Sequence, residues 1–320
     1  MKHAISLLVA SQIIPLTAVS AQQPASPDVA AETGDKPVEM PVKPTSTPFK
    51  LLDNLVVVET TISGRPHSAV LDSGAGGLVM DKAFAQEAGL TEGQDVIDAA
   101  GAGTQAQELR PTIVPDLRVG PLRFERLPAY AGDLTQLSAS AGFAVNFLIG
   151  APAFKYGAVT VDYARRRVTF GPSGSAGRCA APIPLTISND APVVEAEIRP
   201  TADARPVRLR LLVDLGTRHH ALAIGGPFVR SEAGLVLAKS GVQQKVGHGV
   251  GGSVQGTVVQ VEELRLGGMR IQGLKAALTG EIPAFEAAKI DGTLGVPLWE
   301  SGVITFDYPA KTMCITTPHS

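Results

Sequence analysis

The chain has 320 residues, of which 44% are hydrophobic and 18% are charged, and its net charge is −2. A nearly neutral chain without a cluster of lysine and arginine lacks the basic surface that nucleic acid requires, so we expect no nucleic-acid partner. Aromatic residues make up only 5% of the chain, whereas it has 34 glycines and 24 prolines. This composition favours a β-rich fold with many turns over a helical bundle.

Residues 1–21 have the pattern of a signal peptide. Lys2 and His3 precede an apolar stretch from Ala4 to Val19, and Val19-Ser20-Ala21 offers a small-residue cleavage site. Serine, glutamine and proline interrupt the stretch, which favours cleavage over a membrane anchor. We therefore expect a periplasmic or secreted protein with no stable membrane anchor after the signal peptide is removed.

Residues 22–48 are rich in proline, alanine, threonine and glutamate and show no hydrophobic periodicity. Such a segment reads as a flexible leader. A propeptide is the alternative, in which Lys36 or Lys43 would pair with acidic residues in a cleft.

The next elements are strands, and the most informative of them ends in an aspartate. An apolar alternation from Val56 to Ile62 predicts a strand that enters a hairpin at Ser63-Gly64. The apolar run 68–71 then leads into the turn Asp72-Ser73-Gly74-Ala75. Helices are expected at Lys82–Ala88 and, much later, at Pro283–Lys289.

The second half of the chain repeats this order. The apolar run 209–213 leads into Asp214-Leu215-Gly216-Thr217, as the run 68–71 leads into Asp72. A Leu-Arg-apolar-Gly segment follows about 50 residues after each aspartate. The remaining paired segments are Leu148-Ile149-Gly150 with Thr293-Leu294-Gly295, and Val159–Tyr163 with Val303–Tyr308. Four landmarks in one order predict an internal duplication, with homologous all-β lobes at residues 49–178 and 179–320 and a few short helices.

An aspartate on a tight glycine turn at the end of an apolar strand has a chemical use. Glycine two residues later, at Gly74 and Gly216, allows backbone amides to approach the carboxylate. One such turn per lobe would bring two carboxylates together, and like charges in contact share one proton. One carboxylate then activates a water while the other polarises a carbonyl.

At these residues the chain resembles the aspartic protease superfamily, and it is most similar to bacterial retropepsin-like proteins, here with two lobes in one chain. The resemblance covers about 270 residues, from Phe49 to the C-terminus. It implies a pepsin/retropepsin fold, endopeptidase activity on a peptide or unfolded protein, and no cofactor. It also implies that Asp72 and Asp214 are the catalytic pair, supported by Ser73, Gly74, Ala75, Gly216 and Thr217. Within that set, Ser73 would make half of a hydrogen-bond grip between the lobes, and Thr217 would bond the outer oxygen of Asp214.

Leu215 departs from the pattern of this superfamily. It replaces the hydroxyl residue of the second turn, so that half of the grip is expected to be missing, at a cost of about 1–3 kcal/mol in positioning. A second hypothesis follows, in which the protein has lost hydrolysis and binds peptides in the cleft between its lobes. A third, less favoured, is a structural domain whose cleft is vestigial.

Two glycine-containing hairpins are candidate mobile covers, or flaps. The first, residues 95–109, carries Gly101 and Gly103 near its tip, and the second carries Gly249 and Gly251. Residues 247–252 also match G-x-G-x-x-G, but alternation in residues 253–261 predicts a strand afterwards, which favours a hairpin over a phosphate-binding loop.

The remaining cysteine, histidine and aspartate residues that we considered do not have the spacing of a metal site. Cys179 and Cys314 are either one disulfide in an oxidising compartment or two buried thiols. His219 and His220 are adjacent and would point to opposite faces of a strand, so they are not expected to bind one metal ion. Asp162 and Asp307 repeat between the halves but are expected to be turn residues at strand ends.

Overall fold

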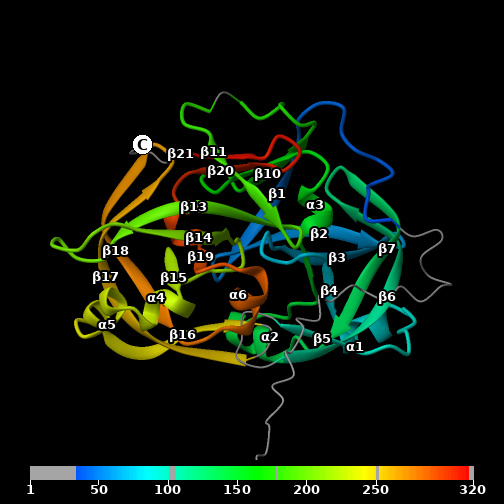
Figure 1. Ribbon diagram of the computed structural model, residues 1–320. Coiled ribbons are helices and arrows are strands. Elements are labelled where there is room, and N and C mark those ends of the chain that lie inside the picture. Colours follow the sequence, from blue (N-terminus) through cyan, green and yellow to red (C-terminus); the bar gives the residue numbers. More distant parts are fainter. Residues whose placement is uncertain (1–33, 101–105, 178, 250–251, 317–320) are drawn as a thin grey trace, which may run out of the picture. The chain divides into compact units, whose positions relative to one another are not determined.

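The computed structural model describes residues 34–100, 106–177, 179–249 and 252–316, and these residues form mainly β-structure (Figure 1). They contain two sheets, one of 13 strands and one of eight. In spatial order, the larger sheet consists of β11 (Ile183–Pro184), β21 (Thr312–Thr316), β20 (Val303–Asp307), β9 (Ala158–Asp162), β10 (Arg167–Gly171), β1 (Thr45–Leu52), β2 (Leu55–Ile62), β3 (Arg65–Leu71), β8 (Phe147–Ile149), β4 (Leu78–Asp81), β7 (Leu122–Gly132), β6 (Ala106–Val119) and β5 (Ile97–Ala100). The smaller sheet consists of β12 (Thr186–Ser188), β13 (Ala191–Arg199), β14 (Val207–Val213), β19 (Gly292–Leu294), β15 (Leu222–Ile224), β18 (Met269–Thr279), β17 (Gly252–Leu266) and β16 (Val242–Gly249). The predicted all-β fold class is therefore confirmed.

The pairing of the strands repeats between the two sheets, as the internal duplication predicts. In the first lobe β8 lies parallel to β3 and antiparallel to β4, while β4 lies parallel to β7. In the second lobe β19 has the same relation to β14 and β15, and β15 lies parallel to β18. Each aspartate follows the strand, β3 or β14, that runs parallel to the central short strand.

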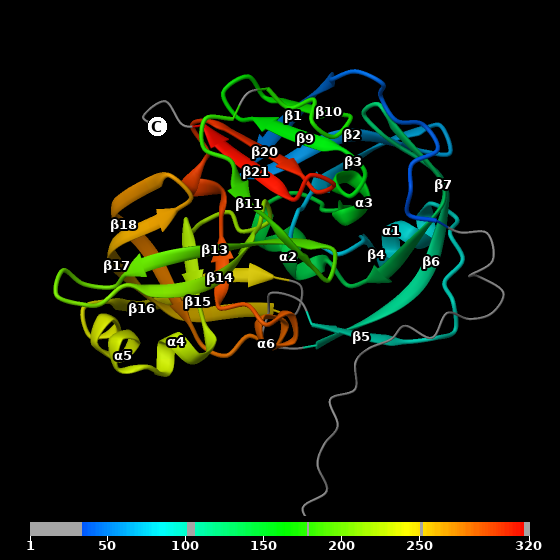
Figure 2. The same cartoon turned by 45° about the horizontal axis from the view of Figure 1, so that its top comes forward.

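The last strands of the chain belong to the first sheet rather than the second. β20 pairs with β9 from Val303↔Asp162 to Asp307↔Ala158, and β21 continues the sheet beyond β20 (Figure 2). Cys314 in β21 is joined by a disulfide bond to Cys179, which precedes β11. The two halves are thus connected by backbone hydrogen bonds as well as by the single chain crossing between them.

Two-residue turns close equivalent hairpins in the two lobes. Asp53 and Asn54 join β1 to β2, and Asn189 and Asp190 join β12 to β13. All four have positive φ angles, between 46° and 62°. Asp and Asn tolerate this left-handed conformation better than other non-glycine residues, which explains why they occupy both turns.

The helices are short. α1 (Lys82–Glu87) begins at Asp81, whose carboxylate accepts from the backbone nitrogens of Ala83 at 3.0 Å and Phe84 at 3.3 Å. The predicted helices are therefore present as α1 and α6 (Pro283–Ala288), each ending one residue earlier than expected. The sequence did not predict α2 (Thr135–Ala141), α3 (Ala151–Phe154), α4 (Gly226–Arg230), α5 (Glu232–Ala238) or the 3₁₀ turn η1 (Val296–Leu298). None of the helices in the described part of the chain has the length and apolar character needed to cross a membrane.

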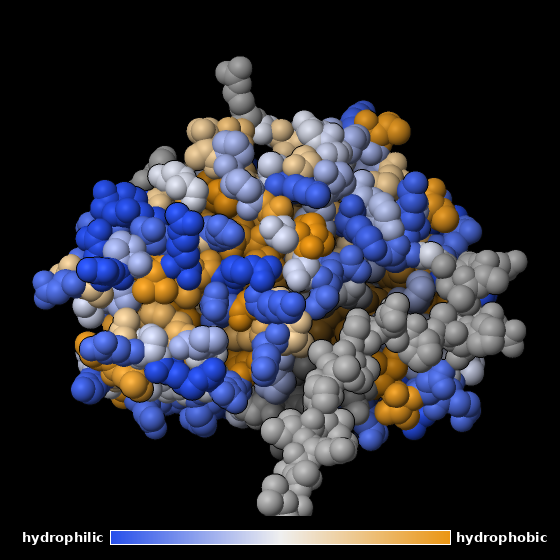
Figure 3. Space-filling model, in the orientation of Figure 1, coloured by the Kyte–Doolittle hydropathy of each residue, from blue (hydrophilic) through white to orange (hydrophobic). Residues whose placement is uncertain are grey.

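The buried side chains form one large cluster and two smaller ones. The largest fully buried side chains of the large cluster include Trp299, Tyr163 and Phe154. On the face shown in Figure 3, hydrophobic residues are interspersed with hydrophilic ones. Among the described residues, large exposed hydrophobic side chains include Leu235, Val236 and Val242 at α5 and the start of β16.

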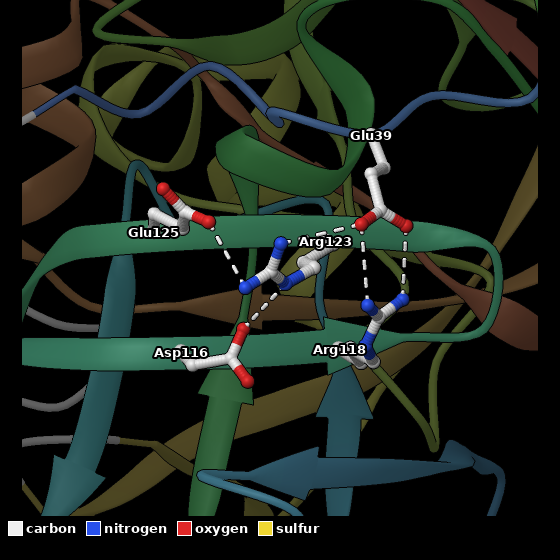
Figure 4. Close-up of polar contacts among 5 residues, drawn as sticks. All are labelled: Glu39, Asp116, Arg118, Arg123 and Glu125. Carbon is white, nitrogen blue, oxygen red and sulfur yellow. Dashed lines mark hydrogen bonds and ion pairs between the residues drawn. The ribbon is translucent and has the colours of Figure 1, made fainter.

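Residues 34–44, within the segment interpreted as a leader, contact the first lobe through acidic side chains. Asp35 Oδ2 lies 2.7 Å from Lys155 Nζ. Glu39 accepts from Arg118 Nη1 at 3.0 Å and Arg123 Nη1 at 3.3 Å, and Arg123 also pairs with Asp116 and Glu125 (Figure 4). The next residues, Thr45–Pro48, already pair with β10, so the first strand begins before the predicted lobe boundary at residue 49. The propeptide alternative rested on Lys36 and Lys43, but the ion pairs that fix this part of the segment come from Asp35 and Glu39.

Candidate active site

Equivalent local structures place Asp72 and Asp214. The backbone nitrogen of Asp72 donates to Ile149 O at 3.0 Å, and that of Asp214 donates to Leu294 O at 2.9 Å. Each acceptor is the last residue of a short central strand, β8 or β19, which lies parallel to the strand before the aspartate. The hydrophobic-hydrophobic-Gly segments singled out in the sequence therefore lie directly behind the two turns.

The glycines of the two turns contact the carboxylate of their own turn and that of the other lobe. Gly74 N donates to Asp72 Oδ1 at 2.9 Å, and Gly216 N donates to Asp214 Oδ1 at 2.7 Å. A Cβ atom on Gly74 would lie 2.6 Å from Asp214 Oδ1, and one on Gly216 would lie 2.9 Å from Asp72 Oδ2. Real Cβ atoms do not approach oxygen this closely, so a side chain at either position would displace the carboxylate of the opposite lobe.

The two carboxyl groups are in contact, and this changes the protonation of Asp72. Asp214 is only 8% exposed and Asp72 is half-buried. Burial raises the pKa of Asp72 well above its usual value of 3.8, and the negative charge of Asp214 and the hydrogen bond to it raise the pKa further. The pair is therefore arranged to hold one proton between its two carboxyl groups.

Hydrogen bonding favours placing that proton on Asp72. Thr217 Oγ1 donates to Asp214 Oδ2 at 2.7 Å, in addition to the amide of Gly216 on the other oxygen. Ala75, at the equivalent position of the first turn, has no hydroxyl to give Asp72. Asp72 accepts only from backbone amides, those of Gly74 and Ala75, and its pKa is raised, so we place the proton of the pair on Asp72.

A single hydroxyl links the two turns. Ser73 Oγ donates to Val213 O at 2.8 Å and accepts from the backbone nitrogen of Leu215 at 3.0 Å. Ser73 is fully buried, so both bonds lie away from solvent. The side chain of Leu215 is also fully buried and belongs to the hydrophobic core, where it makes no reciprocal polar link. The link between the turns is therefore one-sided.

The segments behind the two turns end in Gly150 and Gly295 because there is no space for a side chain at either position. A Cβ atom on Gly150 would lie 1.8 Å from Ala75 O, and one on Gly295 would lie 2.4 Å from Thr217 O. The backbone of each aspartate turn therefore rests directly on the glycine that follows β8 or β19.

Comparison with known protein families shows which family the chain belongs to. The sequence model of the family described as aspartyl protease matches residues 58–152 and 197–298, one match in each lobe and together more than half of the chain. The chain belongs to the aspartyl protease family.

The fold likeness extends to solved structures. The crystal structure of aspartic proteinase from Irpex lacteus is similar with a TM-score of 0.51 and 11% identity, over 85% of this chain and 97% of that one. Basic 7S globulin from soybean gives a TM-score of 0.48 and 12% identity, over 85% of this chain and 94% of that one. At 11% identity the likeness to the Irpex lacteus enzyme concerns the fold alone. A comparison with curated protein sequences gives no match.

The glycine-containing hairpins of this aspartyl protease chain are only partly described. Gly101, Gly103 and Gly251 lie outside the described residues, and β5 pairs with β6 up to Ala100↔Ala106. Gly249 ends β16 and pairs with Gly252 at the start of β17, so the G-x-G-x-x-G segment connects two strands. Gly252 lies near the first lobe, since a Cβ on it would be 3.8 Å from Gln136 Oε1 in α2.

Asp162 and Asp307 hold turns at strand ends, and Asp307 also accepts from Ser173 Oγ and Gly174 N at 2.7 Å each. Asp162 accepts from Arg165 N at 2.8 Å, and Asp307 accepts from Ala310 N at 3.1 Å, as turn residues at strand ends do. Within the described ranges, no group of three or more His, Cys, Asp or Glu side chains is placed to hold a metal ion.

Sequence reasoning missed a buried arginine beside the second turn. Arg218 directly follows Thr217 and is 4% exposed. It forms an ion pair with Asp53 and donates from Nη2 to Ser140 Oγ at 2.6 Å, both in the first lobe. The internal repeat could have drawn attention to Arg218. It is four residues after Asp214, where the first turn has Gly76, and a charged residue at this position is unexpected.

Proposed function

We propose that the protein is an aspartic endopeptidase whose catalytic pair is Asp72 and Asp214. The contact between these two carboxyl groups, one from each lobe on equivalent glycine turns, carries the proposal. Membership of the aspartyl protease family supports peptide-bond hydrolysis as the reaction class.

The hydrogen bonds of the two carboxyl groups support a different role for each of them in the proposed reaction. A water held between the carboxyl groups gives a proton to Asp214 as it attacks the peptide carbonyl, and protonated Asp72 donates to the carbonyl oxygen. In the second step Asp214 passes its proton to the leaving amine and Asp72 recovers its own from the hydroxyl of the intermediate. Water supplies the atoms that are added, and the pair ends with one proton, as it began.

The proposed substrate is an extended peptide or an unfolded protein bound between the lobes. A Cβ on Gly252 would lie 3.8 Å from Gln136 Oε1 in the first lobe, so the β16–β17 hairpin is near both lobes, and a cover of this kind over a bound peptide would exclude water from the reaction. Peptide backbone would add hydrogen bonds to the strands of this hairpin.

A peptide-binding protein without hydrolysis is the second candidate, and Leu215 is the observation that favours it. With Ser73 as the sole hydroxyl in the link, the turns have fewer restraints than two hydroxyl residues would provide. Such a protein would keep the fold and bind peptides but release them uncut.

We also propose that the protein is exported to the periplasm or beyond. The signal-like residues 1–21 support this, as does the bond between Cys179 and Cys314, because disulfides persist mainly in oxidising compartments. N-terminal sequencing of the protein recovered outside the cytoplasm should begin at Gln22. Recovery only from the cytoplasm with Met1 retained would contradict export.

The test of the reaction is cleavage of an unfolded protein by the folded chain between about pH 3 and about pH 8. Asp72→Asn and Asp214→Asn should each lower the rate by about 10²-fold or more, since each removes an acid–base group. Asp162→Asn is the matched control, because Asp162 is also a duplicated aspartate but its carboxylate bonds Arg165 within its own turn, and it should retain the rate. Specific peptide binding without cleavage would favour the second candidate.

A further inference from the structure

Each lobe places a two-residue turn against the catalytic turn of the other lobe. The Asn189–Asp190 turn of the second lobe reaches the first catalytic turn, where a Cβ on Gly76 would lie 3.0 Å from Asn189 O. The Asp53–Asn54 turn of the first lobe reaches the second catalytic turn, where Asn54 Nδ2 donates to Arg218 O at 2.9 Å. The two contacts are equivalent in position, but only the second involves a long side chain.

The Arg218 side chain extends from this contact into the first lobe. Its Nη1 forms an ion pair with Asp53 Oδ2, and its Nη2 donates to Ser140 Oγ in α2. His219 Nε2 lies 3.8 Å from the same Asp53 oxygen. Three polar contacts, two from the guanidinium and one to the carbonyl of Arg218, therefore join residue 218 to two separate elements of the other lobe.

The burial of Arg218 makes this connection dependent on its partners. A guanidinium that is 4% exposed has lost most of its hydration, and burial lowers its pKa while the Asp53 carboxylate opposes that shift. Removing one partner of such a pair is strongly unfavourable because it leaves a charge buried alone. The planar fork of arginine also reaches two acceptors in fixed directions, which a lysine ammonium does not.

Arg218 is one residue away from the group that orients Asp214. Thr217 Oγ1 donates to Asp214 Oδ2 at 2.7 Å, and Thr217 O accepts from Val296 N at 2.8 Å. A movement of residue 218 relative to the first lobe would therefore move Thr217 and Asp214 relative to Asp72.

We propose that Arg218 is a positioning residue that supplies the cross-lobe link Leu215 lacks. Ser73 attaches the first turn to the second, and Arg218 attaches the second turn to Asp53 and Ser140 of the first lobe. The inference rests on the proposed function in one respect, that the two carboxyl groups must be held in contact. Its main measurement, the titration of these carboxyl groups, does not require catalysis.

The first measurement is a pH titration of the aspartate carboxyl carbons by NMR on the full chain. Asp72→Asn and Asp214→Asn identify the signals of the pair. In Arg218→Met the higher of the two apparent pKa values should fall by about one unit, because carboxyl groups that move apart no longer share a proton tightly. Arg123→Met is the matched control, since it also removes an arginine with several carboxylate partners, namely Glu39, Asp116 and Glu125, which lie outside both aspartate turns (Figure 4). It should leave the titration unchanged.

A folded Arg218→Met variant with the wild-type titration overturns the proposal, whatever its thermal stability. If that variant does not fold, Ser140→Ala decides, since it removes one acceptor and leaves the ion pair with Asp53. It should lower the same apparent pKa by a smaller amount, and an unchanged titration overturns the proposal.

The second measurement separates positioning from a general structural role. Arg218→Lys should lower kcat by about 10-fold and change KM by less than about 2-fold, as expected for misplaced catalytic groups with intact substrate contacts. Adding Leu215→Thr, which restores a hydroxyl to the link, should recover most of the kcat lost in Arg218→Lys. An equal loss of kcat with and without Leu215→Thr contradicts the proposed compensation. A chain that shows the shared-proton titration but cleaves nothing refutes the endopeptidase and not the role of Arg218.

Discussion

Ser73 Oγ lies 3.0 Å from the backbone nitrogen of Leu215, although the two residues are 142 positions apart in the chain. The same oxygen donates to Val213 O, so one fully buried hydroxyl satisfies two backbone groups of the other lobe. These two bonds join the turns that carry the paired carboxyl groups.

Ser73→Ala should therefore destabilise the fold. It leaves a buried carbonyl and a buried amide without their partner, at about 1–3 kcal/mol for each group. Urea unfolding measures the loss. Ser46→Ala removes an exposed hydroxyl pair with Thr169 and should change the free energy of unfolding by less than about 0.5 kcal/mol. A similar small effect for Ser73→Ala would contradict the importance of the link.

Two equivalent tyrosines should respond differently to loss of the hydroxyl. Trp299 Nε1 donates to Tyr163 OH at 3.3 Å, whereas Tyr308 stacks on Phe154 and its hydroxyl has no hydrogen-bond partner among the described residues. Tyr163→Phe leaves a buried indole N–H unpaired and should cost about 1–3 kcal/mol. Tyr308→Phe should cost almost nothing or stabilise the protein. Urea unfolding of both variants checks this, and equal losses would refute it.

Asp72→Asn should stabilise the fold at neutral pH. Because the pKa of Asp72 is raised in the folded state, the folded protein binds more protons than the unfolded one above pH 3.8, and stability falls as pH rises toward the folded pKa. Asparagine removes this loss. The melting temperature of the variant should exceed that of the wild type at neutral pH, and the part of the difference due to titration should disappear below the ordinary aspartate pKa. A pH-independent difference would show that ionisation is not its cause.

Gly74→Ala should disrupt the carboxyl pair. Its Cβ would lie 2.6 Å from Asp214 Oδ1, and a displacement of about 1 Å at a catalytic group can cost about 10²-fold in rate. Peptidase assays at acid pH, with the carboxyl titration as a second readout, measure the effect. Gly177→Ala is the control, because a Cβ there meets no atom within 4 Å and both readouts should stay at wild-type values.

Loss of the disulfide should lower stability without altering the site. Cys179 and Cys314 close a loop over a sequence separation of 135 residues, and removing such a bond costs about 2–5 kcal/mol. Unfolding of the Cys179→Ser, Cys314→Ser double variant in urea tests this. Wild-type stability of that variant would be the contrary result.

Several strands, the duplication and the two aspartate turns could be predicted from the sequence alone. These features have local signatures: alternation of apolar residues, glycine where a turn contacts a carboxylate, and the same landmarks in both halves. α1 and α6 could also be predicted, because Asp81 and Pro283 are residues typical of helix starts. α2 escaped prediction because its N-cap residue is Leu134, whose side chain cannot cap a helix, and its seven residues include two serines.

Tertiary structure decided how the two halves meet. The contact of Asp72 with Asp214, the choice of Ser73 as the only hydroxyl in the link, and the burial of Arg218 all depend on the packing of one lobe against the other. Arg218 and Asp53 are 165 positions apart in the chain. No pattern within a few residues of Arg218 indicates that its guanidinium is buried or that Asp53 is its partner. Local propensities act over a few residues, whereas the burial of a charge depends on every element that removes water from it.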